Sequence, residues 1–356
     1  MTLLLSAPPG LIFAEEAPPA VITSSTPVSS TIEASETLAA ASLELYQGPR
    51  VKKFPAVKYP SDQAWSRNEG WVTLSMMISS KGEPYEVGIL DSTGNKSLEQ
   101  TALKATSGMV FAPASFEGKP VESSYVYRFR YEMYGRRTAT PEFAAAYLAV
   151  AEAVKSTDRA RADTAMAALK ALKISNLYED ALFGIATYNY AAAWGNDMQQ
   201  LNGLNRALSG GVDQRYLPDE LYRLAVQACF QVQIHAHLFL EALDTWKRMQ
   251  KAGFEPAVLE AYKPTVAKIE ALHDDAVPFD IDGTLENGRW HLKLLRHSFS
   301  VVVSEGRIDE VKLRCEKKYV YFAFDQSQSY KVSDKFGQCM IDLEGAPDTR
   351  FTFTQS

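Results

Sequence analysis

The histidines and the acidic residues near them are the side chains of this chain that could do metal or acid–base chemistry. His235 and His237 stand two residues apart in a stretch that predicts a helix. Metal ligands on one helix face need a spacing of three or four residues, so this pair predicts no metal site. His291, Asp280 and Asp282 lie in a stretch that predicts β-strands. Paired carboxylates do acid–base work only in a shared cleft, so an enzyme with its site in the C-terminal β region stays an alternative.

The motifs of the common enzyme classes are missing from the sequence. There is no GxSxG nucleophile elbow, no GxGxxG or GxxxxGK[ST] phosphate loop and no HExxH zinc motif. We therefore predict no catalytic residue, no metal ligand and no small-molecule cofactor, and we expect a protein that is not an enzyme.

Three cysteines are scattered along the chain, at positions 229, 315 and 339. None belongs to a CxxC pair, which argues against a structural zinc site. In an exported chain Cys315 and Cys339 could form a disulfide, which would stabilise the fold by roughly 3 kcal/mol. Two buried free thiols are the alternative, and the compartment decides between them.

Length and charge limit the classes of partner. A chain of 356 residues predicts two or three domains. With 37 basic and 43 acidic residues, the formal net charge of −6 provides no basic field for nucleic acid or an anionic membrane. We therefore expect no nucleic-acid partner.

Residues 1–45 predict a signal-like segment followed by a flexible linker. The apolar runs Leu3–Leu5 and Leu11–Ala14 are too short for the ~20 residues of a membrane helix. Ala14 before two glutamates resembles a signal-peptide cleavage point, but a basic n-region is missing. We interpret this as a signal peptide whose start lies upstream of Met1; a polar tail is the alternative. Residues 15–45 are rich in Ala, Ser, Thr and Pro, which is typical of a linker.

Residues 46–135 predict a small α+β layer. Trp71–Ile78 alternates between apolar and polar residues, as a half-buried strand does, and Tyr85–Ile89 repeats the pattern. Ser97 with Gln100 three residues later is a capping-box signature for a helix. The last strand, Ser124–Met133, carries aromatic side chains on one face and arginines on the other.

A set of short motifs in this region occurs in a particular order. The motifs are Tyr59-Pro60, Gly70-Trp71-Val72, Lys81-Gly82-Glu83-Pro84, Asp91-Ser92-Thr93-Gly94, Phe111-Ala112-Pro113-Ala114 and Gly118-Lys119-Pro120-Val121. This order resembles the C-terminal domain of the TonB family, the periplasmic module of a cell-envelope energy transducer. The resemblance implies a periplasmic protein that binds other proteins, such as outer-membrane transporters, by adding an extended partner segment to a sheet edge.

By this resemblance the last strand is the partner-binding edge. Its candidate residues are Tyr125, Val126, Tyr127, Arg128, Phe129 and Arg130. Arg128 and Arg130 could pair with a carboxylate of the partner. The alternative is that both arginines belong to a solvated face.

The chain also departs from the family pattern. No spanning helix is visible, the linker is short and more than half of the chain follows the TonB-like region. This favours a periplasmic adaptor over an energy transducer. A membrane-anchored TonB energy transducer remains the alternative if its anchor lies upstream of Met1.

Residues 140–275 predict an α-helical region. Phe143, Leu182 and Leu221 are spaced 39 residues apart, which suggests repeated helix pairs. This is similar to tetratricopeptide-type repeats, although their usual period is ~34 residues. An irregular helical bundle is the alternative.

Residues 277–356 predict an antiparallel all-β region, either a sandwich or a small barrel. Asn287-Gly288 is a strong hairpin signal, and short strand-like runs separated by polar turns follow it. The expected fold is therefore a multidomain α+β protein with a TonB-like α+β module, an α-helical repeat middle and an antiparallel all-β C-terminal domain.

Overall fold

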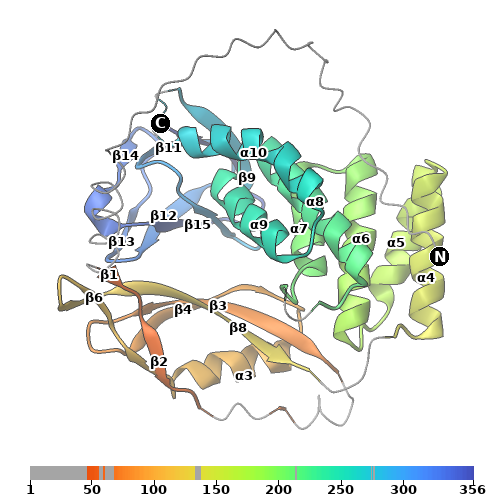
Figure 1. Cartoon of the computed structure of the whole chain (residues 1–356), viewed down its shortest axis with the longest axis horizontal. Coiled ribbons are helices and arrows are strands. Elements are labelled where there is room, and N and C mark those ends of the chain that lie inside the picture. The colour runs from red at the N-terminus through yellow and green to blue at the C-terminus, as the bar shows by residue number, and fades with distance from the viewer. Residues whose placement is uncertain are drawn as a thin grey trace, which may run out of the picture.

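The computed structural model describes residues 46–55, 59–60, 68–132, 138–212, 215–273, 275 and 277–356. It has the expected fold class: a small α+β region, helices in the middle and antiparallel sheets at the C-terminal end (Figure 1). The signal-like segment and linker predicted for residues 1–45 lie outside the described residues, as does Met133 at the end of the predicted edge strand.

The first part, here called the N-terminal module (residues 46–132), contains a three-stranded sheet with a helix on one face. Its elements are β1 (Tyr46–Gln47), β2 (Arg50–Lys53), β3 (Gly70–Ile78), β4 (Pro84–Ser92), α3 (Lys96–Thr106), β5 (Val110–Ala112), β6 (Ala114–Phe116), β7 (Lys119–Val121) and β8 (Ser123–Tyr131). The sheet order is β4–β3–β8 and all pairs are antiparallel. Leu98 and Ala102 of α3 pack on Val72 and Leu74 of β3 to form a separate small core.

The helix α3 begins at a different cap from the one predicted. Asn95, not Ser97, is the N-cap, and its side chain accepts hydrogen bonds from the backbone N–H groups of Ser97 and Leu98. Asn and Ser are almost equally good caps, so the local pattern alone did not separate the two positions.

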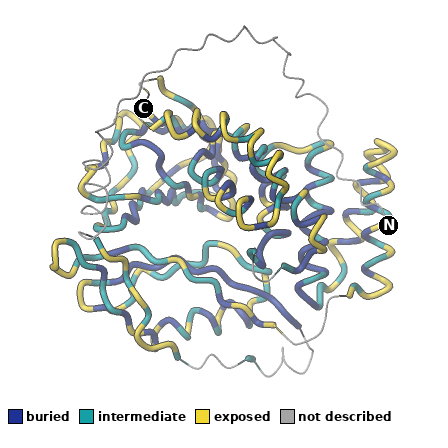
Figure 2. Tube along the Cα trace, in the orientation of Figure 1, coloured by how far each residue is buried: buried dark blue, intermediate teal, exposed yellow. Residues whose placement is uncertain are grey.

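Strand β3 is buried on both faces, so the prediction of a half-buried strand was wrong. All nine residues are buried, and the strand is part of the dark-blue interior in Figure 2. One face contacts α3, as expected. The other face, with Trp71, Thr73 and Ser75, is covered by later parts of the chain.

The middle of the chain consists of helices that pack in consecutive antiparallel pairs. They are α4 (Pro141–Lys155), α5 (Arg159–Ala171), α6 (Leu177–Trp194), α7 (Asp197–Ala207), α8 (Asp219–His235), α9 (Phe239–Lys251) and α10 (Pro256–Ala271). Phe143, Leu182 and Leu221 are buried and lie in α4, α6 and α8, the first helices of three successive pairs. That these pairs are true sequence repeats stays a prediction.

The C-terminal part, here called the β region (residues 277–356), is made of two four-stranded antiparallel sheets. The strands are β9 (Phe279–Thr284), β10 (Arg289–Lys293), β11 (Ser298–Glu305), β12 (Ile308–Cys315), β13 (Tyr319–Ala323), β14 (Ser329–Lys331), β15 (Cys339–Gly345) and β16 (Arg350–Gln355). Trp290 joins the sheets by packing against Phe351 and Phe353. Asn287 and Gly288 form a turn, both with positive φ (52° and 80°). The strands on either side, β9 and β10, belong to different sheets, so the predicted hairpin was wrong.

The helices and the β region share one hydrophobic core. Buried residues run continuously from α4 to β16, and Trp71 of the N-terminal module is inserted into the same cluster. The Trp71 indole N–H donates to Asp180 Oδ2 of α6 (3.1 Å), and Arg206 of α7 binds the other oxygen of this buried carboxylate. Burial raises the pKa of Asp180, whereas Arg206 and Trp71 stabilise the charged form.

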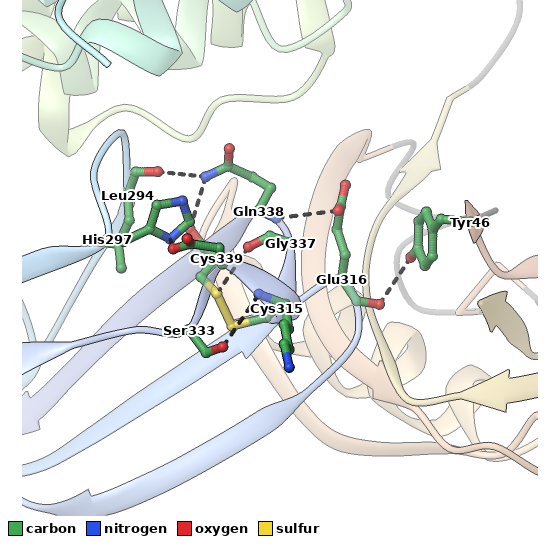
Figure 3. The surroundings of a disulfide bond; sticks show 11 residues. Tyr46, Leu294, His297, Cys315, Glu316, Ser333, Gly337, Gln338 and Cys339 are labelled. Carbon is green, nitrogen blue, oxygen red and sulfur yellow. Dashed lines mark hydrogen bonds and ion pairs between the residues drawn. A yellow bond between two sulfur atoms is a disulfide. The ribbon is translucent and has the colours of Figure 1, made fainter. Parts of the chain in front are cut away.

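Cys315 and Cys339 are joined in a disulfide at the boundary of the β region with the N-terminal module (Figure 3). They lie directly opposite each other on β12 and β15. The next residue, Glu316, accepts a hydrogen bond at its backbone carbonyl from the Tyr46 hydroxyl (3.0 Å). The disulfide therefore fixes a turn that contacts the first strand of the N-terminal module.

Candidate protein-binding edge

Strand β8 is the outer strand of the N-terminal sheet on the side away from β4. It pairs with β3 over nine consecutive residues with no register shift. Among the described residues no strand pairs with its other side. The predicted edge strand is thus an outer strand of the sheet.

The hydrogen bonds of Trp71 identify the β8 residues whose backbone groups face away from β3. Its N–H donates to Thr93 Oγ1 (3.3 Å) and its carbonyl accepts from the Thr93 N–H (3.1 Å), so both groups point toward β4. Bonding direction alternates along a strand, and Trp71 lies opposite Arg130 of β8. The β8 residues whose N–H and C=O groups point away from the sheet are therefore Ser124, Val126, Arg128 and Arg130.

The centre of this edge is accessible and its start is anchored. The Val126 side chain is 51% exposed, although it is apolar. At the start of β8, the Ser123 hydroxyl bonds the Tyr46 hydroxyl (2.8 Å), which ties this end to β1 and to the turn at Glu316. The accessible edge is therefore the stretch from Ser124 to Arg130.

The role considered for the two arginines needs correction. Arg128 donates to Thr73 Oγ1 (2.7 Å) and to the Ser209 carbonyl (2.5 Å), and its guanidinium lies 4.5 Å from the centre of the Trp71 ring. Arg130 donates to the Gly210 carbonyl (3.0 Å). Both side chains hold the turn after α7 against the sheet, so they are neither reserved for a partner carboxylate nor simply solvated.

The face of β8 opposite Arg128 and Arg130 carries a row of aromatic side chains. Tyr125, Tyr127 and Phe129 point toward the α3 side, where the Phe111 ring packs on Tyr125. Phe54, just after β2, places its ring 5.2 Å from Tyr127 and 5.8 Å from Phe129 (centroid distances). No periodic pattern predicts the position of Phe54, because that position depends on the pairing of β2 with β5.

A hollow of about 190 Å³ lies beside the C-terminal half of β8. It is lined by Phe54, Tyr59, Tyr127, Phe129, Arg130, Tyr131 and Glu132. Burial raises the pKa values of Tyr59 and Tyr131 to about 12 each, so both hydroxyls stay protonated at neutral pH. We call this feature the aromatic hollow.

Strand β4, at the opposite edge of the sheet, contacts the β region. Arg314 of β12 donates to the Glu86 carbonyl of β4 (2.8 Å) and to Asp342 of β15 (2.7 Å). The pairing of β4 with β3 has two register shifts, and Glu86 has a positive φ of 48°. Bulges and covering segments both protect a sheet edge from foreign strands.

The structure does not assemble the acid–base residues considered in the β region. Asp280 and Asp282 lie on β9 and accept hydrogen bonds from the Thr354 and Thr352 hydroxyls of the neighbouring strand. His291 lies on β10 in the other sheet, opposite Asp342 on the face toward β4. Their side chains are on outer faces of different sheets, so this constellation forms no common cleft.

The remaining histidines also occupy separate positions. His235 binds Asp197, and His237 Nδ1 lies 2.7 Å from the Asp280 carbonyl oxygen. In the part of the chain that the structure describes, no group of three or more His, Cys, Asp or Glu side chains could hold a metal ion. Over the same residues, no helix has the length and apolar character needed to cross a membrane.

Comparison with known proteins agrees with the geometry of the N-terminal module. Residues 55–133 match the family "Gram-negative bacterial TonB protein C-terminal". The resemblance seen in the sequence motifs is confirmed for this module, and the match ends before α4. The solution NMR structure of the Pseudomonas aeruginosa TonB CTD is 20% identical over 25% of this chain and 91% of that chain, with a TM-score of 0.23. None of the curated proteins matches this chain.

Proposed function

We propose that this chain is a protein-binding adaptor of the cell envelope, which docks an extended partner segment as an additional strand along β8. The observation that carries this proposal is the regular strand β8, bonded to β3 on one side and to no strand on the other within the described residues. An extended backbone satisfies such outward N–H and C=O groups.

The TonB C-terminal match at residues 55–133 supports an envelope location and protein partners, such as outer-membrane transporters. Contacts with the rest of the chain hold the edge in a fixed position. Trp71, Arg128 and Arg314 attach the N-terminal module to the helices and to the β region, so β8 is held at a defined place on the molecule. In this proposal the chain binds its partner and catalyses no reaction.

Photo-crosslinking in cells tests strand addition directly. A benzoylphenylalanine at Ser124 is combined with Val126→Pro or, as the matched control, Val126→Thr. Proline removes the outward N–H of residue 126 and leaves the bonds to β3, whereas threonine keeps the N–H. We expect the adduct with an envelope protein to fall at least about tenfold for the proline variant, the equivalent of one lost hydrogen bond, and to persist for the threonine variant. Equal adducts from both variants would contradict docking along this edge.

A further inference from the structure

We infer that the aromatic hollow is a pocket for one aromatic side chain of the docked segment, and that it selects which segments bind. This inference rests on the proposed function, because it deepens the recognition at the same edge. It assigns the ligand a chemistry: an extended segment with a Phe, Tyr or Trp at one fixed position.

The position of the hollow is at the flank of β8 and not on one of its faces. Phe129 and Tyr131 point toward α3, whereas Arg130 and Glu132 belong to the opposite face, yet all four line the same hollow. Residues from alternating faces meet in one cavity only beside the strand. Phe54 forms the outer wall and is 41% exposed. The hollow therefore lies where a docked strand would run.

The size and lining of the hollow fit an aromatic ring. A cavity of about 150 Å³ lined by apolar side chains is large enough to hold benzene, and this hollow measures about 190 Å³. Phe54, Tyr127 and Phe129 offer ring faces and edges for tilted or edge-on packing. Tyr59, Arg130, Tyr131 and Glu132 complete the lining. The Tyr59 and Tyr131 hydroxyls donate to the Asn68 and Leu98 carbonyls, and the Arg130 guanidinium donates to the Gly210 carbonyl.

The pleat of a docked strand determines how many side chains reach the hollow. Successive side chains of a strand alternate between the two faces, and cross-strand neighbours share a face. A guest residue alongside Phe129 therefore points toward α3 and meets Phe54. Its sequence neighbours point toward the turn at Ser209 and Gly210, on the other face. One aromatic position in the guest is thus expected, not a continuous aromatic run.

Selection of displayed random peptides on the whole chain tests this pocket separately from strand addition. The variants are Phe54→Ala, which removes the outer wall, and Val126→Pro, which removes an edge donor. Tyr321→Ala is the matched control, because Tyr321 is an exposed aromatic residue of β13, 65% exposed and away from the edge. Far-UV circular dichroism and the thermal midpoint check that each variant is folded.

We expect peptides selected on the unaltered chain and on the Tyr321→Ala variant to share one aromatic position, and their affinity to fall about tenfold on Phe54→Ala. Peptides selected on Phe54→Ala should lose the aromatic preference and still depend on Val126. Edge-dependent peptides with no aromatic position, or with equal affinity for Phe54→Ala, would overturn the pocket and leave strand addition standing. Peptides that ignore Val126→Pro would overturn both.

Discussion

The two outer strands of the N-terminal sheet, β4 and β8, differ in regularity and in the contacts that they make. Strand β4 is bulged in two places, and Arg314 of β12 bonds its Glu86 carbonyl. Strand β8 is regular over its whole length, and Val126 at its centre is half exposed. Natural proteins protect sheet edges that must not pair, and the regular, accessible edge of β8 is therefore the one on which the proposed docking is placed.

Strands β4 and β8 also differ in their contacts with the rest of the chain. The β4 side carries buried charged contacts between the N-terminal module and the β region, next to the disulfide. On the β8 side, Arg128 and Arg130 bond the turn after α7, and the start of the strand lies near β12. The outward backbone groups of the strand have no partner strand in the described part of the chain. Changes on the β4 side should therefore affect stability, and changes along the β8 edge should affect binding.

Arg314→Ala should have the largest effect. It leaves the buried Asp342 carboxylate without its main partner and removes the bond to Glu86. We expect the free energy of unfolding to fall by about 3 to 4 kcal/mol, at the low end for a broken buried pair, because Arg289 stays 3.8 Å from Asp342. Urea unfolding measures this. Arg307→Ala, at an exposed ion pair, is the control and should change stability by less than about 1 kcal/mol.

Replacing Cys315 and Cys339 by serine should have the next largest effect. The bridge closes a loop with a sequence separation of 24 residues, so its loss should cost about 3 kcal/mol. Unfolding of the unaltered chain with and without a dithiol reductant provides the matched measurement. A double-serine variant as stable as the oxidised chain would show that the turn at Glu316 needs no covalent link.

Arg128→Ala tests whether this side chain is structural. Loss of charged hydrogen bonds to Thr73 and Ser209 should lower the free energy of unfolding by about 2 kcal/mol. Lys119→Ala, at an exposed residue of β7, should remain within about 0.5 kcal/mol. Equal, small changes for both would mean that Arg128 behaves as a solvated surface residue.

A pair of proline variants measures the bonding direction along β8. The Tyr125 N–H points toward β3 and the Val126 N–H points outward, as the contacts of Trp71 imply. Tyr125→Pro should therefore destabilise the fold by about 1 to 2 kcal/mol more than Val126→Pro, because it leaves a ladder acceptor on β3 unpaired. The reverse order of stability would mean that the outward residues are the odd-numbered ones.

Local patterns in the sequence predicted several elements correctly. The alternating aromatic and polar residues of Ser124–Met133 predicted β8, and Asn287-Gly288 predicted a turn, because each signal lies within a few neighbouring residues. The strands before and after that turn pair with other strands, which the local signal does not report. The motif order predicted the TonB C-terminal resemblance.

The contacts between distant segments could not be predicted in this way. Trp71, Thr73 and Ser75 were expected on a half-buried strand, but all three are buried, and the Trp71 indole bonds Asp180, 109 residues further along the chain. The same long-range packing gives Arg128 its intramolecular partners. Phe54 became part of the candidate site only through strand pairing of β2, which no local pattern reports.

Amide hydrogen exchange along β8, measured residue by residue by NMR, tests the central claim most directly. In the free chain we expect slow exchange at Tyr125, Tyr127 and Phe129, which bond β3, and fast exchange at Val126, Arg128 and Arg130, which face outward. A docked peptide should slow the second set alone. Equal protection of all six amides in the free chain would contradict the account, because the outer side of β8 would then already be paired.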